Sequence, residues 1–326
     1  VESYREELKD EIDFWKFLQY KFYQQWGKLR AYANEQGISI IGDIPIYVAL
    51  DSADVWTHPE LFLLDEENLT PLKVAGVPPD AFSETGQLWG NPLYRWDVQE
   101  KTDFAWWKER MKASARLYDV VRIDHFIGVT QYYAIPAGSE DGKTGERLKG
   151  PGKKLTDAIN MVIGDTKIIA EDLGIFVPEV KELLEETGYP GMKIIEFAFS
   201  GDRFNEHLPH MYSPNSVVYG GTHDNETLVG YFKPEARQWW ELQYIADYMG
   251  VSHQHEVVDK VLKTAYASVA SVVIFQAQDI LKLDSWARMN TPGTVGNNWR
   301  WRMKPGELTQ DHINHLSWLV DTFGRF

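Results

Sequence analysis

The apolar positions of the chain follow two periods, one typical of amphipathic helices and one typical of buried strands. Near the start, apolar residues recur at steps of three and four, on one face of a helix that Gly37 can end; they are Leu8, Ile12, Trp15, Leu18, Phe22, Trp26, Leu29 and Ala33. The next run, ISIIGDIPIYV, is short and rich in β-branched residues, which predicts a buried strand. Five more such runs follow: YDVVRID, TKIIAED, GMKIIEF, SVVYGGTHD and SVVIFQAQD.

Helical stretches separate these six predicted strands. They are expected at residues 101–117, 155–163, 179–186 and, as one long stretch, about 234–270. Because parallel neighbours can be joined only through a crossover, this alternation predicts parallel pairing in an α/β fold. Two architectures have that pattern, the doubly wound sheet and the β/α barrel.

Acidic residues at the strand ends favour the barrel. A doubly wound nucleotide-binding domain should open with G-x-G-x-x-G, and the sequence has no such motif. Active sites of β/α barrels are assembled at the carboxyl ends of their strands. Those ends, or the positions just beyond them, are where we expect Asp43, Asp124, Glu171, Asp172, Glu196, Asp224 and Asp279. The predicted fold is therefore a TIM (β/α)8 barrel with long inserted loops.

The predicted strands are fewer than a closed barrel needs. Six strands are two short of eight, so we expect residues 1–326 to be about the last six β/α units, the C-terminal two-thirds of a catalytic barrel, with the N-terminal units absent from this chain. Such a chain by itself would have open sheet edges, and we expect it to be poorly stable and weakly active.

The connection at about residues 51–100 is much longer than the usual βα loop. It contains GVPPDAFSETGQLWGNPLYRW, which is rich in aromatic residues and turn formers. A substrate-covering loop and a rigid structural subdomain both explain this composition.

Composition excludes several classes of function. The 33 basic and 48 acidic side chains give a net charge of −15, which argues against nucleic-acid and anionic-membrane partners. The absence of Cys excludes disulfides, thiolate catalysis and zinc–thiolate sites, and it favours a cytoplasmic location. The longest uncharged stretch, 264–278, is too short and too polar to span a bilayer. Aromatic residues make up 13% of the chain, a content that suits both core packing and stacking on sugar rings.

Three acidic motifs carry the candidate chemistry. In VVRIDHF, Arg122 and Asp124 lie two apart on a strand and point the same way; the guanidinium would keep a carboxylate nucleophile ionised, although a structural Arg–Asp pair has the same pattern. In IIAEDLG, Glu171 ends an apolar strand, as a general acid/base would and as a solvated tip or helix cap also would. GGTHDNET concentrates hydrogen-bonding groups after two glycines, which suits recognition of adjacent hydroxyls and equally the capped start of a helix.

RIDHF, AEDLG and THDNET, in this order and at strand ends, resemble the amylomaltases, the 4-α-glucanotransferases of glycoside hydrolase family 77 in the α-amylase clan. GVPPDAFSETGQLWGNPLYRW resembles the substrate-covering loop of that family, and GDIPIYVALDSADVW, RMNTPGT and NWRWR are also similar. The resemblance extends from about Ile38 to Arg302.

The resemblance implies roles for individual residues. Asp124 matches the nucleophile, Glu171 the general acid/base, and Asp224 the carboxylate that holds ring hydroxyls and stabilises the transition state. The matching substrate-binding residues are Arg122, His125, His223, Asp43 and Asn290, with Asp80, Phe82, Glu84, Gln87 and Trp89 in the covering loop.

The implied reaction transfers segments of α-1,4-glucan between maltooligosaccharides, or glucans derived from starch and glycogen, by a retaining double displacement. Asp124 would form a glucosyl-enzyme and Glu171 would first protonate the leaving oxygen and then deprotonate the acceptor, with the two carboxyl groups roughly 5–5.5 Å apart. No metal or organic cofactor is expected, and the sequence leaves the oligomeric state open. The alternatives are an α-glucan hydrolase of the same clan and a non-catalytic glucan-binding fragment.

Overall fold

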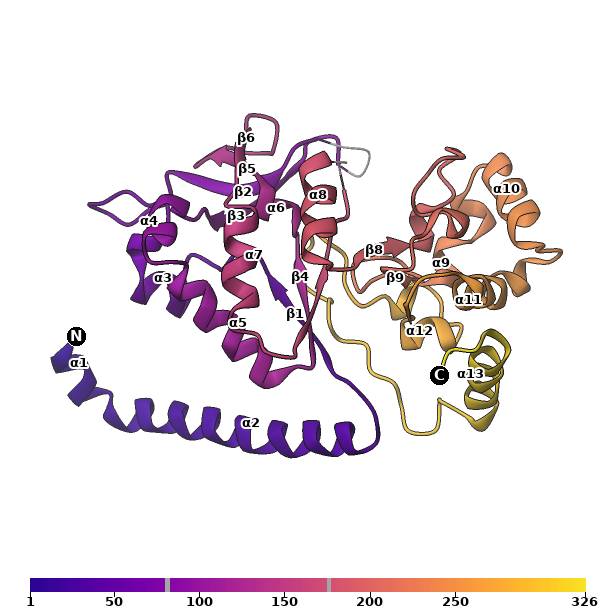
Figure 1. The fold of residues 1–326 in the computed structure, drawn as a ribbon, viewed down its shortest axis with the longest axis horizontal. Coiled ribbons are helices and arrows are strands. Elements are labelled where there is room, and N and C mark those ends of the chain that lie inside the picture. The colour runs from indigo at the N-terminus through magenta and orange to yellow at the C-terminus, as the bar shows by residue number, and fades with distance from the viewer. Residues whose placement is uncertain (80–82, 175–176) are drawn as a thin grey trace. The chain divides into compact units, whose positions relative to one another are not determined.

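The chain divides into two compact units, and each is described by itself. The structure, a computed structural model, describes residues 1–79, 83–174 and 177–326. Unit 1 contains residues 1–171 and 175–187, and unit 2 contains residues 172–174 and 188–326. Figure 1 gives the order and labels of the elements.

A three-stranded parallel sheet, in the order β1-β4-β7, forms the centre of unit 1. Its strands are β1 (Ile41–Pro45), β4 (Val120–Asp124) and β7 (Lys167–Ala170). On β4 the alternate residues Val121 and Ile123 are fully buried, so Arg122 and Asp124 project from the opposite face of the strand. The apolar alternation of VVRID thus positions both polar side chains.

Helices pack on the buried face of this sheet. In Figure 1 the helices α5 (Ala105–Leu117) and α7 (Lys153–Asn160) lie beside it, and they contact each other. The large buried side chains of this core include Trp107, Met111, Leu155 and Ile159. The other helical elements of unit 1 are α1 (Glu2–Glu7), α2 (Lys9–Glu35), α3 (Ala53–Thr57), η1 (Pro59–Leu61), α4 (Trp96–Lys101), α6 (Ile127–Thr130) and α8 (Pro178–Thr187).

The first predicted helix has no buried residue. It forms as two helices, α1 and α2, and Gly37 follows the end of α2 with a positive φ of 75°, as expected of a helix-terminating glycine. Trp15, Phe17 and Tyr20 are more than half exposed. Contacts within unit 1 hold the far end of α2, where Trp26 Nε1 donates to Leu117 O at 2.8 Å.

The long connection at 51–100 contains regular structure. Two of its segments form β2 (Lys73–Val77) and β3 (Gln87–Pro92), which pair with each other. They join β5 (Gln131–Pro136) and β6 (Glu146–Lys149) in a four-stranded antiparallel sheet in the order β3-β2-β5-β6. Much of the segment therefore contributes strands to a sheet that it shares with residues 131–149.

Unit 2 is built on a second parallel sheet, in the order β10-β9-β8. Its strands are β8 (Gly191–Ile194), β9 (Ser216–Tyr219) and β10 (Val272–Ile274). All six predicted strands are thus present, in two parallel sheets of three. The helical elements are η2 (Ile195–Phe197), η3 (Pro209–Met211), α9 (Leu228–Tyr231), η4 (Pro234–Ala236), α10 (Trp239–Met249), η5 (Gln254–Glu256), α11 (Val257–Ala267), α12 (Ala277–Ile280), η6 (Ser285–Ala287) and α13 (Gln310–Phe323).

The long helical stretch expected at about 234–270 is divided in the structure. The segment forms two main helices, α10 and α11, which are separated at Gly250. This residue has a left-handed conformation, with φ 66°, and ends α10. The break lets α10 and α11 pack against each other around a core that includes Ile245, Val258 and Leu262.

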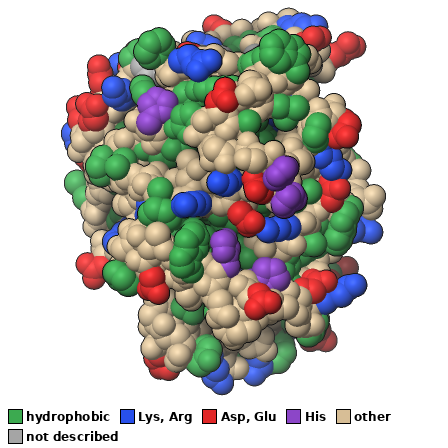
Figure 2. Space-filling model, turned by 90° about the vertical axis from the view of Figure 1, so that its right-hand side faces the viewer, with side chains coloured by type: hydrophobic (Ala, Val, Ile, Leu, Met, Phe, Trp, Pro, Cys, Tyr) green, Lys and Arg blue, Asp and Glu red, His purple; other side chains and the backbone are tan. Residues whose placement is uncertain are grey.

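Among the described residues, no helix has both the length and the apolar character that crossing a membrane requires. On the face drawn in Figure 2, Lys and Arg side chains are dispersed among acidic, histidine and hydrophobic ones. This mixture differs from the continuous basic surface typical of a nucleic-acid-binding domain.

Candidate active site

Arg122 lies between two carboxylates in unit 1. Strand register places Asp43 beside Arg122, and Arg122 Nη1 donates to both carboxylate oxygens of Asp43 at 2.7 Å. Its other nitrogen, Nη2, lies 3.0 Å from Asp124 Oδ1. The Arg122 side chain is 9% exposed, while the two aspartate side chains are about 40% exposed. The buried Arg122 guanidinium therefore orients the solvent-accessible carboxylates of Asp43 and Asp124.

Asp43 lies in the middle of β1 rather than at its end, and the parallel register explains why it still belongs to this group. Residue 43 pairs with residue 122, and residue 45 pairs with residue 124. Burial by itself would lower the pKa of Arg122, but the charges of Asp43, Asp124 and Glu171 together outweigh it and raise the pKa above its usual value. Arg122 is therefore a permanent cation in this group.

Glu171 follows the neighbouring strand β7 and contacts the segment after Asp124. Its side chain is buried, and Oε2 accepts a hydrogen bond from the backbone N–H of His125 at 2.7 Å. Backbone bonds lock the same region: Glu171 N donates to Ile123 O at 3.0 Å, and Phe126 N donates to Glu171 O at 2.8 Å. These bonds fix the Glu171 carboxyl relative to β4.

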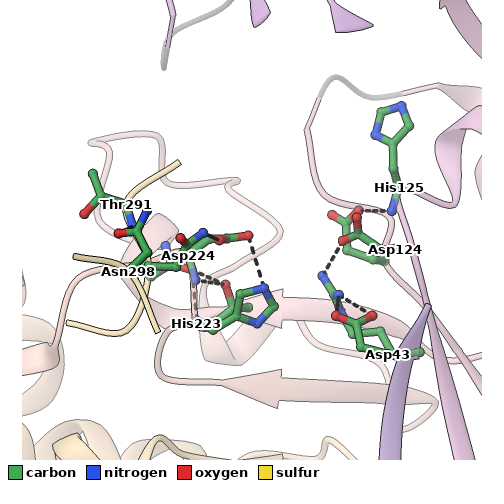
Figure 3. A network of polar contacts seen from close by, with 12 residues as sticks. Asp43, Asp124, His125, His223, Asp224, Thr291 and Asn298 are labelled. Atoms are coloured by element: carbon green, nitrogen blue, oxygen red, sulfur yellow. Dashed lines mark hydrogen bonds and ion pairs between the residues drawn. The ribbon is translucent and has the colours of Figure 1, made fainter. Parts of the chain in front are cut away.

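His125 adopts a left-handed backbone conformation, with φ 52°, which is uncommon for a residue other than glycine. Figure 3 shows its imidazole extending away from Asp124, while its backbone nitrogen makes the bond to Glu171. Burial lowers the pKa of the imidazole to about 4, so the ring is neutral at physiological pH.

Residues of the predicted covering loop approach His125. The indole of Trp89 meets the imidazole edge-to-face, with ring centroids 4.8 Å apart, and Trp89 Nε1 donates to Gln87 Oε1 at 3.0 Å. Trp89 remains 37% exposed, and Glu84 is exposed as well. The predicted positions Asp80 and Phe82 lie outside the described residues.

A second polar group, in unit 2, surrounds Asp224. This residue lies in the turn after β9, and its two carboxylate oxygens have different neighbours. Asn290 Nδ2 donates to Oδ1 at 2.6 Å, and His223 Nε2 lies 3.4 Å from Oδ2. Arg288 Nη2 donates to the backbone oxygen of Asp224 at 2.7 Å. Asp224 is 42% exposed in its side chain and thus accessible to a ligand.

The segment after η6, residues 288–299, contributes further contacts to the polar group around Asp224. The backbone N–H of Asn290 donates to His223 O at 3.1 Å, and the Trp299 ring lies 5.1 Å from the imidazole of His223. Farther along the segment, Asn298 Oδ1 accepts from the backbone N–H of Thr291 at 3.1 Å, a contact visible in Figure 3.

Gly220 and Gly221, which precede the turn, lie too close to neighbouring side chains to carry a side chain of their own. A Cβ at Gly220 would lie 2.7 Å from the ring of Phe275, and one at Gly221 would lie 2.8 Å from Glu196 Oε1. Neither approach leaves room for a side chain. The paired glycines of GGTHDNET thus bring the backbone close to an aromatic ring and to a buried carboxyl group.

The structure adds residues that the sequence reasoning did not assign. Arg288 and Trp299 contact the Asp224 group but lie 64 and 75 positions after it, a separation that no helix or strand period connects. Asn225 Oδ1 accepts two hydrogen bonds from Thr222 within the turn that carries Asp224, and the only sequence signal for Asn225 is its place in GGTHDNET. The only sequence signal for Arg288 was its place in RMNTPGT.

Comparison with known proteins identifies the class to which this fold and these carboxylate groups belong. The family model described as 4-alpha-glucanotransferase, that of glycoside hydrolase family 77, matches residues 1–309. The chain belongs to this family. The α/β fold of the TIM-barrel type predicted from the sequence is confirmed by the solved structures.

The individual relatives carry the same name. The chain is 48% identical to the 4-alpha-glucanotransferase of Clostridium butyricum over 325 residues, which is 100% of this chain and 66% of that protein. It is 46% identical to that of Thermus thermophilus, over 98% of this chain and 64% of the relative. A solved amylomaltase from Streptococcus agalactiae in complex with acarbose superposes with a TM-score of 0.94 at 42% identity, covering 99% of this chain and 65% of that one. The chain thus spans about two-thirds of the length of these relatives.

Proposed function

We propose that the chain carries the catalytic carboxylates of a retaining 4-alpha-glucanotransferase. The observation that carries the proposal is the Asp43–Arg122–Asp124 group on adjacent strands of a parallel sheet, with Glu171 directly after the next strand. This group offers one accessible, ion-paired carboxylate and one buried carboxyl group, the two kinds that a double displacement on a sugar needs. The names of the relatives support the same activity.

In this mechanism Asp124 attacks the anomeric carbon of an α-1,4-linked glucan. Glu171 protonates the departing oxygen, and a β-linked glucosyl-enzyme forms. Glu171 then takes the proton from the 4-hydroxyl of an acceptor glucan, which attacks the same carbon and restores the α-linkage. The proton balance closes because Glu171 gives and regains one proton in each cycle.

The remaining residues hold the sugar. Asp224 and His223 would accept and donate hydrogen bonds at the ring hydroxyls, and Asn290 keeps the Asp224 carboxylate oriented through its 2.6 Å bond. Asp124, Glu171 and Asp224 are the three carboxylates that the proposal assigns to the reaction, and Arg122, His125, Asp43 and the covering-loop residues would bind the glucan.

The proposal includes a polypeptide partner for α2. The relatives are about one and a half times as long as this chain, and one face of α2 exposes apolar side chains, among them Trp15, Leu18 and Phe22. An apolar stripe of this kind is buried in most helices of globular proteins. We therefore propose that a further part of the same protein, the barrel units outside residues 1–326, covers this face.

The test is product analysis with maltotriose. The chain is assayed by itself and after completion with the part of the Clostridium butyricum enzyme that lies outside the aligned region. A transferase yields glucose together with chains longer than maltotriose. The Asp124→Asn variant serves as the control, because it removes the nucleophile while retaining the side-chain volume. Formation of only glucose and maltose would instead identify a hydrolase, and no turnover by the completed chain would identify a glucan-binding protein.

Trp89 gives a further test of transfer against hydrolysis. Its exposed indole packs on His125, next to the backbone bond that holds Glu171. Apolar surface at this point would exclude water and hold the acceptor glucan. We expect Trp89→Ala to raise the ratio of glucose release to chain transfer severalfold in the maltotriose assay. An unchanged ratio would show that the indole does not select the acceptor.

The cytoplasmic location expected from the cysteine-free composition also remains a proposal, and cell fractionation tests it.

A further inference from the structure

Trp299 carries an exposed indole on a backbone conformation that aromatic residues rarely adopt. Its φ is 62°, in the left-handed region, where the Cβ of an ordinary residue crowds the backbone. The residue is 53% exposed, whereas Trp107, a core tryptophan of unit 1, is fully buried. Core packing therefore does not explain why a bulky residue occupies this position, since glycine adopts the same conformation without strain.

Hydrogen bonds to the backbone of Trp299 fix its position. Its N–H donates to Met289 O at 2.7 Å, and its C=O accepts from Arg302 Nη1 at 3.0 Å. The residue after Met289 is Asn290, and the backbone N–H of Asn290 donates to His223 O at 3.1 Å. Two adjacent residues thus bond Trp299 on one side and His223 on the other. These bonds set the position of the indole relative to the turn after β9.

The imidazole of His223 contacts both the indole and the carboxylate of Asp224. The ring centroids of Trp299 and His223 are 5.1 Å apart, with an angle of 42° between the ring planes. Nε2 of the imidazole lies 3.4 Å from Asp224 Oδ2 (Figure 3). The side chains of His223 and Asp224 are 33% and 42% exposed. An indole, an imidazole and a carboxylate are therefore accessible together in one small area of unit 2.

This combination of groups suits a sugar ring. A carboxylate and an imidazole bind the hydroxyl groups at the edge of a pyranose, and a flat apolar ring can cover its C–H face. We propose that Trp299 is a substrate-binding residue of the candidate site: its indole stacks on a glucose ring of the glucan that Asp224 and His223 bind. The inference rests on the proposed function, since it concerns the same site. It adds a contact to the apolar face of the sugar, where Asp224, His223 and Asn290 supply polar groups.

Three substitutions at Trp299 separate a stacking role from a packing role. Glycine removes the indole and adopts φ 62° without strain, so Trp299→Gly should still fold. Phenylalanine keeps a flat ring, and leucine keeps an apolar side chain of similar size without a flat face. If the indole stacks on a sugar, leucine should behave like glycine. If the indole only fills space in the loop, leucine should behave like phenylalanine.

The kinetic experiment measures kcat and KM for maltotriose with these variants of the completed chain, and calorimetry measures maltotriose affinity in an Asp124→Asn background, which prevents turnover. Trp299→Gly and Trp299→Leu should each raise KM and Kd about tenfold, and Trp299→Phe should retain most of the affinity. The kcat of each variant should stay within about threefold of the wild-type value, because a contact made equally to substrate and transition state changes KM alone. The control is Trp239→Ala, which removes an exposed indole from α10 and should leave KM and Kd unchanged.

The indole N–H of Trp299 gives a direct readout of the contact. Its NMR signal in the Asp124→Asn chain is identified by its loss in the Trp299→Phe variant. Addition of maltotriose should shift this signal, because a sugar stacked on the indole changes its surroundings. The indole signal of Trp239, identified in the same way with Trp239→Ala, should not shift.

Four results overturn the inference while the proposed function stands. They are an unchanged KM for Trp299→Gly, a fall in kcat without a rise in KM, equal affinities of Trp299→Leu and Trp299→Phe, and an indole signal of Trp299 that maltotriose does not shift. If the wild-type completed chain does not turn maltotriose over, the proposed function fails. The affinity and the indole signal then decide the inference, which is overturned if Trp299→Gly and Trp239→Ala bind maltotriose equally or if the unsubstituted chain does not bind it.

Discussion

Replacing Arg122 with Met tests the electrostatic centre of the candidate site. The substitution keeps an unbranched side chain of similar length in a buried position and removes the cation between Asp43 and Asp124. Both carboxylates are about 40% exposed in their side chains and can hydrate, so the chain should still fold. We expect the main effect on the rate of glucosyl transfer, because Asp124 loses its fixed orientation.

The magnitude follows from the contact between Arg122 and Asp124. At the observed 3.0 Å and an effective dielectric of about 20, Coulomb's law gives a ceiling of about 5.5 kcal/mol. Solvent reaches Asp124 and screens the pair, so the net value of one charge-assisted hydrogen bond, about 1.5–3 kcal/mol, is the appropriate scale. Because about 1.4 kcal/mol corresponds to a factor of ten in rate, kcat should fall by about 10- to 150-fold.

The assay is glucose release and chain lengthening from maltotriose by the completed chain, with kcat and KM determined separately. Arg122→Lys is the matched control: it keeps the positive charge but replaces the two-armed guanidinium with one ammonium group, which cannot bond both carboxylates in the same geometry. Its kcat should lie between those of the wild type and Arg122→Met. A kcat for Arg122→Met within twofold of the wild-type value, with intact folding, would refute the reasoning.

Three further predictions concern single contacts. Gly221→Ala should destabilise the chain by about 1–3 kcal/mol in chemical denaturation, because the new Cβ would lie 2.8 Å from Glu196 Oε1. Gly27→Ala is the control: a Cβ at that position has no atom within 4 Å, so the substitution should not destabilise α2. Asn290→Ala should lower kcat/KM about tenfold, through loss of the 2.6 Å bond to Asp224; an unchanged value would remove Asn290 from the site. The imidazole of His125 should titrate near pH 4 by NMR, and because this pKa lies below the unfolded value, His125 should reduce stability progressively as the pH falls below about 6.5; His125→Asn should lessen that loss.

The parallel sheets were predictable because their signal is local. Each strand is a short β-branched run between turn formers, and the acidic residue near its end can be read from the same segment. On β4, the two-residue period alone placed Arg122 and Asp124 on one face, and their 3.0 Å contact agrees with it. The pairing of Asp43 with Arg122 also depends on the strand register, which no local pattern specifies.

The supports of Asp224 were not predictable, because they depend on long-range contacts. Arg288 reaches the backbone oxygen of Asp224, and the Trp299 ring lies beside His223, both from a loop with no regular period. The break between α10 and α11 was missed for a different reason. A single glycine is tolerated within a helix, so Gly250 did not by itself contradict a continuous apolar period.

The long helix α2 is unevenly anchored. All its described side-chain bonds to other elements come from its second half, where Trp26 bonds to Leu117 O and Arg30 and Asn34 bond to Asp119. Among the described residues, the hydrogen bonds of the part nearer Glu2 are its own backbone ladder and local side-chain pairs. Amide hydrogen exchange in residues 1–326 alone should therefore be graded along α2, slowest beside Asp119 and fastest toward the N-terminus, since fraying there breaks no described hydrogen bond to another element.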